Sequence, residues 1–293
     1  MYKIVYSFFY LLSLIPWRIL YVISDGLYIL VYYILGYRKD VVRKNLLIAF
    51  PTKTEKERER IAKDFYHNFI DTFIETIKLL SISKKEFDKR IETNAEVVNN
   101  VLYLNKTIQL HTGHFFNWEF LNLGIAANIK TTFVGVYMPL KNKHFDKLII
   151  KLRSKFGTVL LPATAFKTKY HQYINQQHAL GLVADQNPGD PRFAYWHPFF
   201  NKMTSFVMGP EKGATSKNVI VFFVDFHKIK RGYYRIEYKL ITTNPKELPK
   251  GEITRLFIAF LEYCIQKDPA NYLWSHKRWK WEFDEQKHAQ NVI

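Results

Sequence analysis

The stretch that decides the fold is Leu110–Phe120, which reads LHTGHFFNWEF. An apolar, strand-like run over residues 107–111 ends in a Thr-Gly turn, and glycine lets the backbone turn sharply before a helix begins. His114 then lies in the loop and Glu119 in the first helical turns, so we expect their side chains to converge. A carboxylate bonded to one imidazole nitrogen fixes the tautomer and leaves the other nitrogen free to take a proton. The spacing predicts a His114–Glu119 dyad for proton abstraction, although a histidine that merely caps or fills a helix start gives the same pattern.

His111 and His114 also form a His-x-x-His pair, which raises the question of a metal ion. The usual zinc-binding helix has its second histidine four residues after the first, with a glutamate between them. The single cysteine, Cys264, adds little to such a ligand set. We therefore expect neither a metal nor a cofactor.

Composition bounds the classes of protein to consider. With 293 residues, 48% hydrophobic and 24% charged, the chain can build a substantial core as one large α/β domain or two smaller ones. Its aromatic share of 17% favours work at a membrane surface or on an apolar ligand. The net charge of +17 suits nucleic acid, anionic lipid head groups or an acidic protein partner. One cysteine excludes an internal disulfide framework and fits a reducing compartment.

Residues 4–37 form the second informative stretch because they are almost continuously apolar. A helix of about 17–25 apolar residues can span a bilayer, and no small-residue cleavage site follows this run. We therefore predict a membrane anchor over residues 1–40 and a folded domain over residues 41–293. Whether the anchor spans the bilayer or lies in its interface stays open, and a buried helix pair of a soluble core gives the same composition. Basic residues directly after the apolar run place the domain in the cytoplasm by the positive-inside rule: Arg38, Lys39, Arg43 and Lys44.

The rest of the chain alternates strand-like and helix-like segments from Lys106 onward. Such alternation predicts an α/β fold with a mixed, mostly parallel sheet flanked by helices, in which the last two strands are antiparallel. Before it, Thr54 and Glu57 are spaced as a capping box that opens a helix with an apolar stripe at residues 61, 65, 69, 73 and 77. We expect strands near 107–111, 131–137, 158–161, 179–184, 219–226 and 233–241, and helices near 117–127, 142–156, 168–177, 207–216 and 250–267.

Three further places can carry chemistry. Arg153 is expected at a helix end, where it can hold a phosphate in a bidentate fork or form an ordinary solvated basic end. Asp185 and Gln186 follow a buried strand, where α/β sheets place ligands, although Asp185 can equally form the turn before Asn-Pro-Gly. Phe193–Phe200 is an apolar loop suited to lining an acyl-chain channel or covering the core.

The tail Asn271–Trp281 mixes aromatic and basic residues. Such a mixture can stack on nucleic acids, and it also suits a membrane interface. No zinc spacing, ribonucleoprotein signature or isolated basic helix accompanies it. Together with the large apolar content, this favours lipid over nucleic acid.

Taken together, these segments resemble the late acyltransferases of lipid A biosynthesis, the lauroyl and myristoyl transferases of the bacterial inner membrane. The resemblance covers nearly the whole chain, and its ordered set of motifs is more specific than the His-x4-acid motif alone. The residues that carry it are Arg43–Leu46 before Ala49–Pro51, then Gly113 and His114 with Asn117–Glu119, Tyr137, Pro139, Asn142, Arg153, Gly157, Asp185, Gln186, Phe199 and Phe200, and finally Tyr272–Trp274 with His276–Arg278.

The resemblance implies a glycerolipid acyltransferase-like fold and a division of roles. His114 would deprotonate an acceptor hydroxyl, Glu119 would orient His114, and the alkoxide would attack an acyl thioester. Arg153 would bind an acceptor phosphate or stabilise the oxyanion. Asn117, Asp185 and Gln186 would belong to the substrate site. The usual donor of the family is acyl-carrier protein, an acidic partner that the charge of +17 fits as well as it fits an anionic lipid surface.

Three functions are compatible with the sequence. The first is a membrane-bound O-acyltransferase, a monomer at the cytoplasmic face of the inner membrane, that acylates a lipid A precursor from acyl-carrier protein. The second is the same chemistry on another glycolipid, an aminolipid or a lysophospholipid, with acyl-CoA or acyl-carrier protein as donor. The third is a basic membrane- or nucleic-acid-binding protein without catalysis.

Overall fold

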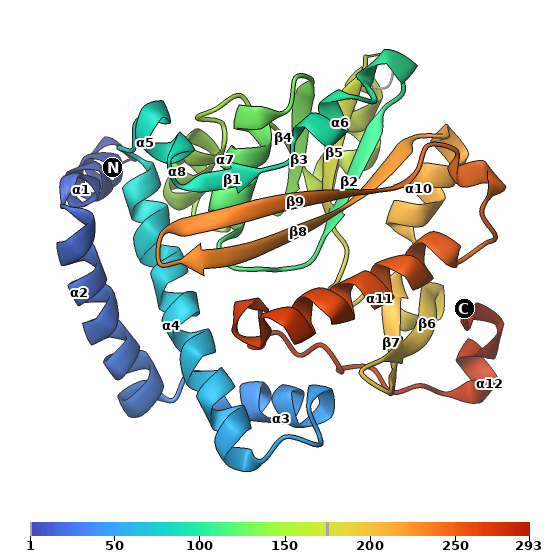
Figure 1. The fold of residues 1–293 in the computed structure, drawn as a ribbon, viewed down its shortest axis with the longest axis horizontal. Coiled ribbons are helices and arrows are strands. Elements are labelled where there is room, and N and C mark those ends of the chain that lie inside the picture. Colours follow the sequence, from blue (N-terminus) through green and yellow to red (C-terminus); the bar gives the residue numbers. More distant parts are fainter. Residues whose placement is uncertain (1, 174–175) are drawn as a thin grey trace.

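A seven-stranded sheet forms the centre of the molecule in the computed structural model, which describes residues 2–173 and 176–293 (Figure 1). Its strands are β1 (Ile91–Thr93), β2 (Ile108–Thr112), β3 (Thr132–Tyr137), β4 (Val159–Pro162), β5 (His178–Val183), β8 (Ile220–Lys230) and β9 (Tyr233–Thr242). They lie in the order β1-β9-β8-β2-β5-β3-β4, and every neighbouring pair is parallel except β8 with β9. The prediction of a mostly parallel sheet with two antiparallel late strands is therefore confirmed.

Helices cover both faces of this sheet. On one face Gly124 of α7 lies against Ile236 of β9, and on the other Phe257 of α11 packs on Phe223 of β8. The helices are α1 (Tyr2–Leu14), α2 (Trp17–Ile29) with a π-helical continuation (Leu30–Leu35), α3 (Lys39–Ala49), α4 (Glu55–Leu79), α5 (Lys84–Asp88), α6 (Glu96–Asn99), α7 (Trp118–Asn128), α8 (Lys143–Arg153), α9 (Phe166–Lys169), α10 (Gly209–Lys217), α11 (Glu252–Lys267) and α12 (Glu285–His288).

One helix expected from the sequence, over residues 168–177, is only partly observable. Its described part contains the end of α9 and a 3-10 turn, Tyr170–Tyr173. Residues 174 and 175 lie outside the described part of the chain. Elsewhere the predicted helices and strands match observed elements to within a few residues.

Helix α4 begins where the sequence predicts, at a complete capping box. Glu57 N–H donates to Thr54 Oγ1 at 3.3 Å, and Thr54 N–H donates to Glu57 Oε2 at 2.7 Å. The predicted apolar stripe is only partly core, because Phe65 is buried whereas Phe73 is half-exposed. The buried side of α4 also includes polar side chains, since the N-terminal helices cover it and provide them with partners.

Helix α2 lies along α4 at one edge of the molecule, and α1 contacts α4 and α8 at the same edge (Figure 1). The helix Trp17–Leu35 is long and apolar enough to cross a membrane by length and composition, but its Leu20, Tyr28 and Tyr32 belong to the main hydrophobic core. The segment is therefore packed against the rest of the fold along one of its sides.

The loop predicted over Phe193–Phe200 is in fact the greater part of a β-hairpin. Strands β6 (Ala194–Phe199) and β7 (Lys202–Val207) form a separate antiparallel sheet. Phe200 and Asn201 both have positive φ, 49° and 60°, as a two-residue type I′ turn requires. Phenylalanine rarely adopts this conformation, so the sequence carries no ordinary turn signal there.

Candidate active site

Two parallel neighbours, β2 and β5, end side by side at the carboxyl edge of the sheet. Thr112 is paired in register with Val183. The residues two positions further on, His114 and Asp185, are therefore neighbours in space although 71 residues separate them in the chain. This edge is where open α/β sheets bind ligands.

Two hydrogen-bond partners hold the His114 ring, and both indicate the same tautomer. Its Nδ1 lies 2.6 Å from Asp185 Oδ1, and its backbone N–H donates to Asp185 Oδ2 at 3.0 Å. Because a carboxylate only accepts, Nδ1 carries the proton in the neutral ring. Nε2 is then an acceptor, and Gln186 Nε2 lies 3.0 Å from it in the position of an amide donor. His114 therefore presents an unprotonated Nε2 at the edge of the sheet.

Asp185 remains ionised although it is buried. Its side chain is 1% exposed, whereas that of His114 is 24% exposed. Burial alone would raise the pKa of Asp185, but the charge and hydrogen bonds of His114, together with the buried Arg278 guanidinium, lower that pKa to about 2. Asp185 is thus a fixed negative charge behind the ring over the working pH range.

Glu119 does not bond to His114, contrary to the expected dyad. Its carboxylate accepts from Arg153 Nε at 2.9 Å and Nη2 at 2.6 Å, and from Trp118 Nε1 at 3.1 Å. Burial opposes the charge on Arg153, but these bonds and the charge of Glu119 raise the pKa of Arg153. The structure thus groups the predicted residues differently: Asp185 and Gln186 with His114, and Glu119 with Arg153.

Asn117 has a structural place at the start of α7. Its Oδ1 accepts from Glu119 N–H at 3.0 Å and Phe120 N–H at 3.4 Å, and its side chain is fully buried. Its Nδ2 lies 3.3 Å from Glu75 Oε2, a carboxylate that also accepts from the Tyr234 hydroxyl at 2.5 Å. Asn117 therefore fixes the helix that follows the His114 loop and does not line the pocket described below.

Glu75 gives a testable pH dependence of stability. Burial raises the pKa of Glu75 to about 7 despite hydrogen bonds that favour its anion. The folded state then holds a proton that the unfolded state releases near pH 4.5, so stability should fall as pH rises from about 4.5 to about 7. We expect Glu75→Gln to remove this slope and to gain up to about 3 kcal/mol over wild type at pH 8. The free energy of urea unfolding, measured at pH 5 and pH 8, tests this prediction, and Glu96→Gln at an exposed residue is the matched control. An equal pH dependence of that free energy in wild type and Glu75→Gln would contradict it.

An apolar pocket of about 320 Å³ opens beside His114. It lies between α7 and the sheet, and Arg153 is also part of its wall. Two glycines, Gly135 and Gly181, are paired in register on β3 and β5 and line the pocket with no side chain of their own. Its apolar lining includes Leu110, Leu121, Ile125, Phe133, Val136, Leu160, Leu182 and Val224. These glycines were not among the residues predicted for the site, although glycine inside a strand pattern is a signal of close approach to a ligand.

The apolar channel expected at Phe193–Phe200 lies elsewhere. Phe199 and Trp196 are buried, and Phe199 stacks on Trp279 of the C-terminal tail. This hairpin lines no part of the pocket beside His114. Its aromatic residues instead fill the core between the small sheet and the tail.

The C-terminal tail supports the His114 loop. Leu273 N–H donates to His114 O at 3.1 Å, and Phe116 N–H donates to Asn271 O at 2.9 Å. Trp274 and Arg278 are almost fully buried, and Arg278 donates to Asn187 Oδ1 and Ser205 O, each at 2.9 Å. The indole of Trp274 is therefore not available to stack on bases, and the basic-aromatic pattern of the tail has a packing role.

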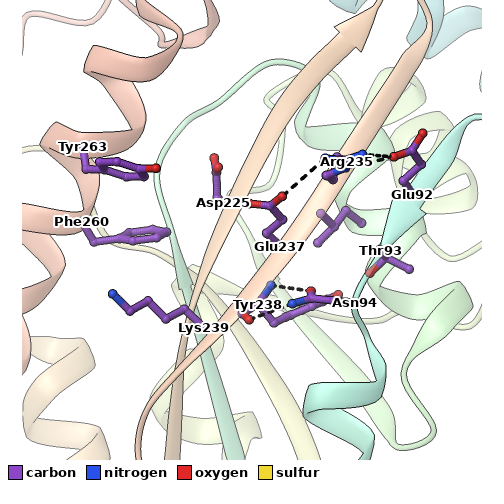
Figure 2. Close-up of a pocket in the computed structure, with 11 residues that line it drawn as sticks. Glu92, Thr93, Asn94, Asp225, Arg235, Glu237, Tyr238, Lys239, Phe260 and Tyr263 are labelled. Atoms are coloured by element: carbon purple, nitrogen blue, oxygen red, sulfur yellow. Dashed lines mark hydrogen bonds and ion pairs between the residues drawn. The ribbon is translucent and has the colours of Figure 1, made fainter.

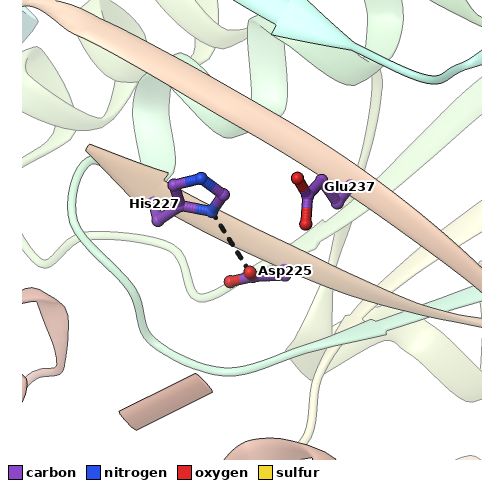
Figure 3. Close-up of side chains that lie close together, drawn as sticks. All are labelled: Asp225, His227 and Glu237. Atoms are coloured by element: carbon purple, nitrogen blue, oxygen red, sulfur yellow. Dashed lines mark hydrogen bonds and ion pairs between the residues drawn. The ribbon is translucent and has the colours of Figure 1, made fainter. Parts of the chain in front are cut away.

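A second cleft lies between β9 and α11, on the other face of the sheet from α7 (Figure 2). Its wall is polar, with Arg235 paired to Glu92 and Glu237. Asp225, His227 and Glu237 approach one another closely there, with potential ligand atoms within 4.8 Å (Figure 3). Lys267 Nζ already pairs with both carboxylates of this cluster, at 3.3 Å from Asp225 and 3.8 Å from Glu237. The arrangement is an ion-pair network that ties α11 to the sheet.

These features define a class of protein: an α/β enzyme with a carboxylate-oriented histidine at the mouth of an apolar pocket and an arginine in the wall of that pocket. The sequence model of the bacterial lipid A biosynthesis acyltransferases matches residues 2–281, nearly the whole chain. The chain therefore belongs to this family, as the resemblance of its motifs implied. Among curated proteins, no sequence matches.

Proposed function

We propose that this protein transfers a fatty acyl chain from the thioester of acyl-carrier protein to a hydroxyl group of a lipid A precursor. The observation that carries the proposal is the His114 imidazole, which is bonded through Nδ1 to a buried carboxylate and lines an apolar pocket. The family supplies the reaction class and the lipid acceptor. Donor, base and location at the cytoplasmic face of the inner membrane are our inferences.

The chemistry needs only side chains of this chain. His114 Nε2 takes the proton of the acceptor hydroxyl, which replaces the Gln186 amide as its partner. The alkoxide attacks the thioester carbonyl, and the tetrahedral oxyanion collapses to an ester with loss of the thiolate. The imidazolium then returns its proton to the thiolate, so His114 ends the cycle neutral. Asp185 stabilises the transient imidazolium because it stays ionised.

Arg153 has two roles open to it in this scheme. Glu119 holds its guanidinium in a bidentate pair at the pocket wall, 22% exposed, where it can stabilise the oxyanion or bind an acceptor phosphate. An oxyanion role predicts that Arg153→Lys lowers kcat, and a phosphate role predicts a higher KM for the acceptor.

The pocket fits the acyl chain because its lining is mostly apolar and its mouth is at His114. The donor fits the charge of the chain, since +17 attracts an acidic carrier protein. Residues 1–40 would anchor the protein, with residues 41–293 as the acyltransferase domain, and no second subunit is required.

The test is transfer of radiolabelled acyl groups to tetra-acylated lipid A precursor, with acyl-acyl carrier protein and acyl-CoA as separate donors. We expect product from acyl-acyl carrier protein. Product from acyl-CoA alone would show that acyl-CoA is the donor. Product only with another glycolipid or a lysophospholipid would show that this other lipid is the acceptor. A folded protein without transfer to any of these lipids would refute the proposal.

Gly181 should set the length of chain that the pocket accepts. A Cβ built on Gly181 would lie 2.9 Å from the ring of Phe133, so a valine there must take space from the pocket. We expect Gly181→Val to lower transfer of long acyl chains about tenfold or more relative to short ones, in keeping with the discrimination available from a few methylenes. Competition between a long and a short donor measures this ratio. Gly209→Val, at a site with open space around it, is the control, and an unchanged ratio in Gly181→Val would place the chain elsewhere.

A further inference from the structure

Helix α2 and its continuation contact α4 along their whole length in antiparallel order. Tyr32 hydroxyl bonds to Glu59, the Tyr28 ring stacks on His67 with 3.5 Å between centroids, and Ser24 Oγ donates to Asp71 at 2.6 Å. Further along, Tyr21 hydroxyl donates to Glu75 at 3.0 Å, and Lys78 Nζ donates to Ser13 O and Ile15 O, at 2.8 Å and 2.9 Å. The side of α2 that faces α4 therefore combines buried core residues with polar groups that already have partners.

The opposite side of the same helices is apolar and exposed. Val22 is 70% exposed and Ile34 is 71% exposed. Within Ile19–Leu35, a range that the structure describes completely, Asp25 is the single charged residue, and it pairs with Arg231 at 2.7 Å. The other large exposed apolar residues of the two helices are Ile4, Phe8, Tyr10, Leu11, Leu14, Ile19, Ile23, Leu27, Ile29, Leu30, Tyr33 and Leu35. We call this set, with Val22 and Ile34, the outer face.

A transmembrane orientation of α2 conflicts with an ion pair that a residue near the middle of this helix forms with the β8–β9 turn. Asp25 lies near the midpoint of Trp17–Leu35, and its partner Arg231 is in the turn between β8 and β9. Arg231 also bonds to Asp71 of α4, and Lys228 of the same hairpin bonds to Asn68. Insertion of the helix across a bilayer would carry this charged hairpin to the membrane centre or break its bonds, and either result is costly.

Charge complementarity identifies the partner of the outer face. Lys3 and Arg18 are exposed on the same two helices, and Lys147 and Lys151 of α8 lie over the rings of Tyr2 and Tyr6, with Nζ 4.6 Å and 3.8 Å from the ring centroids. An apolar face bordered by basic residues is typical of helices that lie in the interface of an anionic membrane. We propose that α1, α2 and Leu30–Leu35 lie flat in the head-group region of an anionic bilayer, with the outer face toward the acyl chains.

This orientation deepens the proposed function, on which it rests for the identity of the acceptor lipid. Phe9 of α1 packs on Phe145 of α8 with 5.8 Å between ring centroids, and α8 ends at Arg153 in the pocket wall. A membrane under α1 would therefore lie close to the pocket. A lipid acceptor could then reach His114 with its own acyl chains still in the bilayer.

Depth measurements on the full chain test the orientation directly. Single cysteines at Ile4, Val22 and Ile34 are labelled with a fluorophore in vesicles of anionic lipid, and lipids that carry quenchers at defined depths locate each label. The native Cys264 is buried, so it should not compete for the label. We expect one shallow depth for all three sites, because the helices lie in the plane. A deep Val22 with Ile4 and Ile34 near opposite surfaces would overturn the proposal.

A second experiment introduces a charge on the outer face and measures binding to vesicles. We expect Val22→Glu to weaken binding to anionic vesicles about tenfold or more. Transfer to detergent-dispersed acceptor should stay within about twofold of wild type, because the substitution is at the surface. Tyr103→Glu, on an exposed residue of the 3-10 turn Leu102–Leu104, is the matched control and should leave binding unchanged.

The depth and binding experiments distinguish a failure of the proposed orientation from a failure of the proposed function. A wild-type chain that shows in-plane labels but no transfer would refute the proposed function and keep the orientation. Vesicle binding that Val22→Glu does not weaken would overturn the orientation. If sedimentation shows that Val22→Glu instead dissociates a dimer, the outer face is a contact between two copies of the chain and the membrane proposal is wrong.

Discussion

Replacing His114 by alanine is expected to lower kcat by about 10²–10⁴-fold, the usual contribution of a general base. The variant loses the imidazole that lines the apolar pocket and whose unprotonated Nε2 is the proposed base. Its fold should persist, because the His114 side chain is partly exposed and the backbone bond from Leu273 remains. Single-turnover transfer from acyl-acyl carrier protein measures the chemical step without a contribution from product release.

The chain offers a matched control for this variant. His227 also has its Nδ1 near a carboxylate, 3.1 Å from Asp225 Oδ2, but it lies at the polar cluster with Lys267. We expect His227→Ala to keep most of the activity. This result would show that removal of a His–Asp pair does not by itself lower kcat. If His114→Ala loses only about twofold, a general-base role for His114 is excluded.

The sheet and its helices could be predicted because their signals are local. A capping box at Thr54, alternating strand and helix segments, and a glycine after β2 each specify structure within a few residues. The hairpin β6–β7 could not be predicted, since its turn uses Phe200 at positive φ where sequence patterns expect glycine or asparagine.

The partner of His114 could not be predicted for a different reason. Glu119 is five residues away and Asp185 is 71 residues away, so local spacing favoured Glu119. The register of Thr112 with Val183 places Asp185 next to His114, and register between distant strands is a tertiary property. The tail shows the same limit: its aromatic and basic pattern suggested a surface, whereas Trp274 and Arg278 are buried behind the site.

Asp185→Asn is expected to lose about 10²–10⁴-fold in kcat, because the asparagine would impose the wrong tautomer on His114. One oxygen of Asp185 accepts the backbone N–H of His114, so an asparagine amide must keep its oxygen there and turn its nitrogen toward Nδ1. The amide would donate to Nδ1, and the ring proton would move to Nε2, where the base is needed. Single-turnover transfer, as for His114→Ala, measures this loss.

Glu119→Gln should behave differently, because Glu119 acts through Arg153. The glutamine keeps one hydrogen bond to the guanidinium and leaves the contacts of His114 intact, so kcat should fall less than in Asp185→Asn. In a double-mutant cycle, Glu119→Gln should couple to Arg153→Lys and be nearly additive with Asp185→Asn, because coupling reports direct contact. If instead Glu119→Gln couples strongly to Asp185→Asn and is additive with Arg153→Lys, Glu119 orients the histidine in the working complex, as its spacing in the sequence suggests. The two possible roles of Glu119 thus predict opposite couplings in one double-mutant cycle, and the measured coupling decides which carboxylate orients His114.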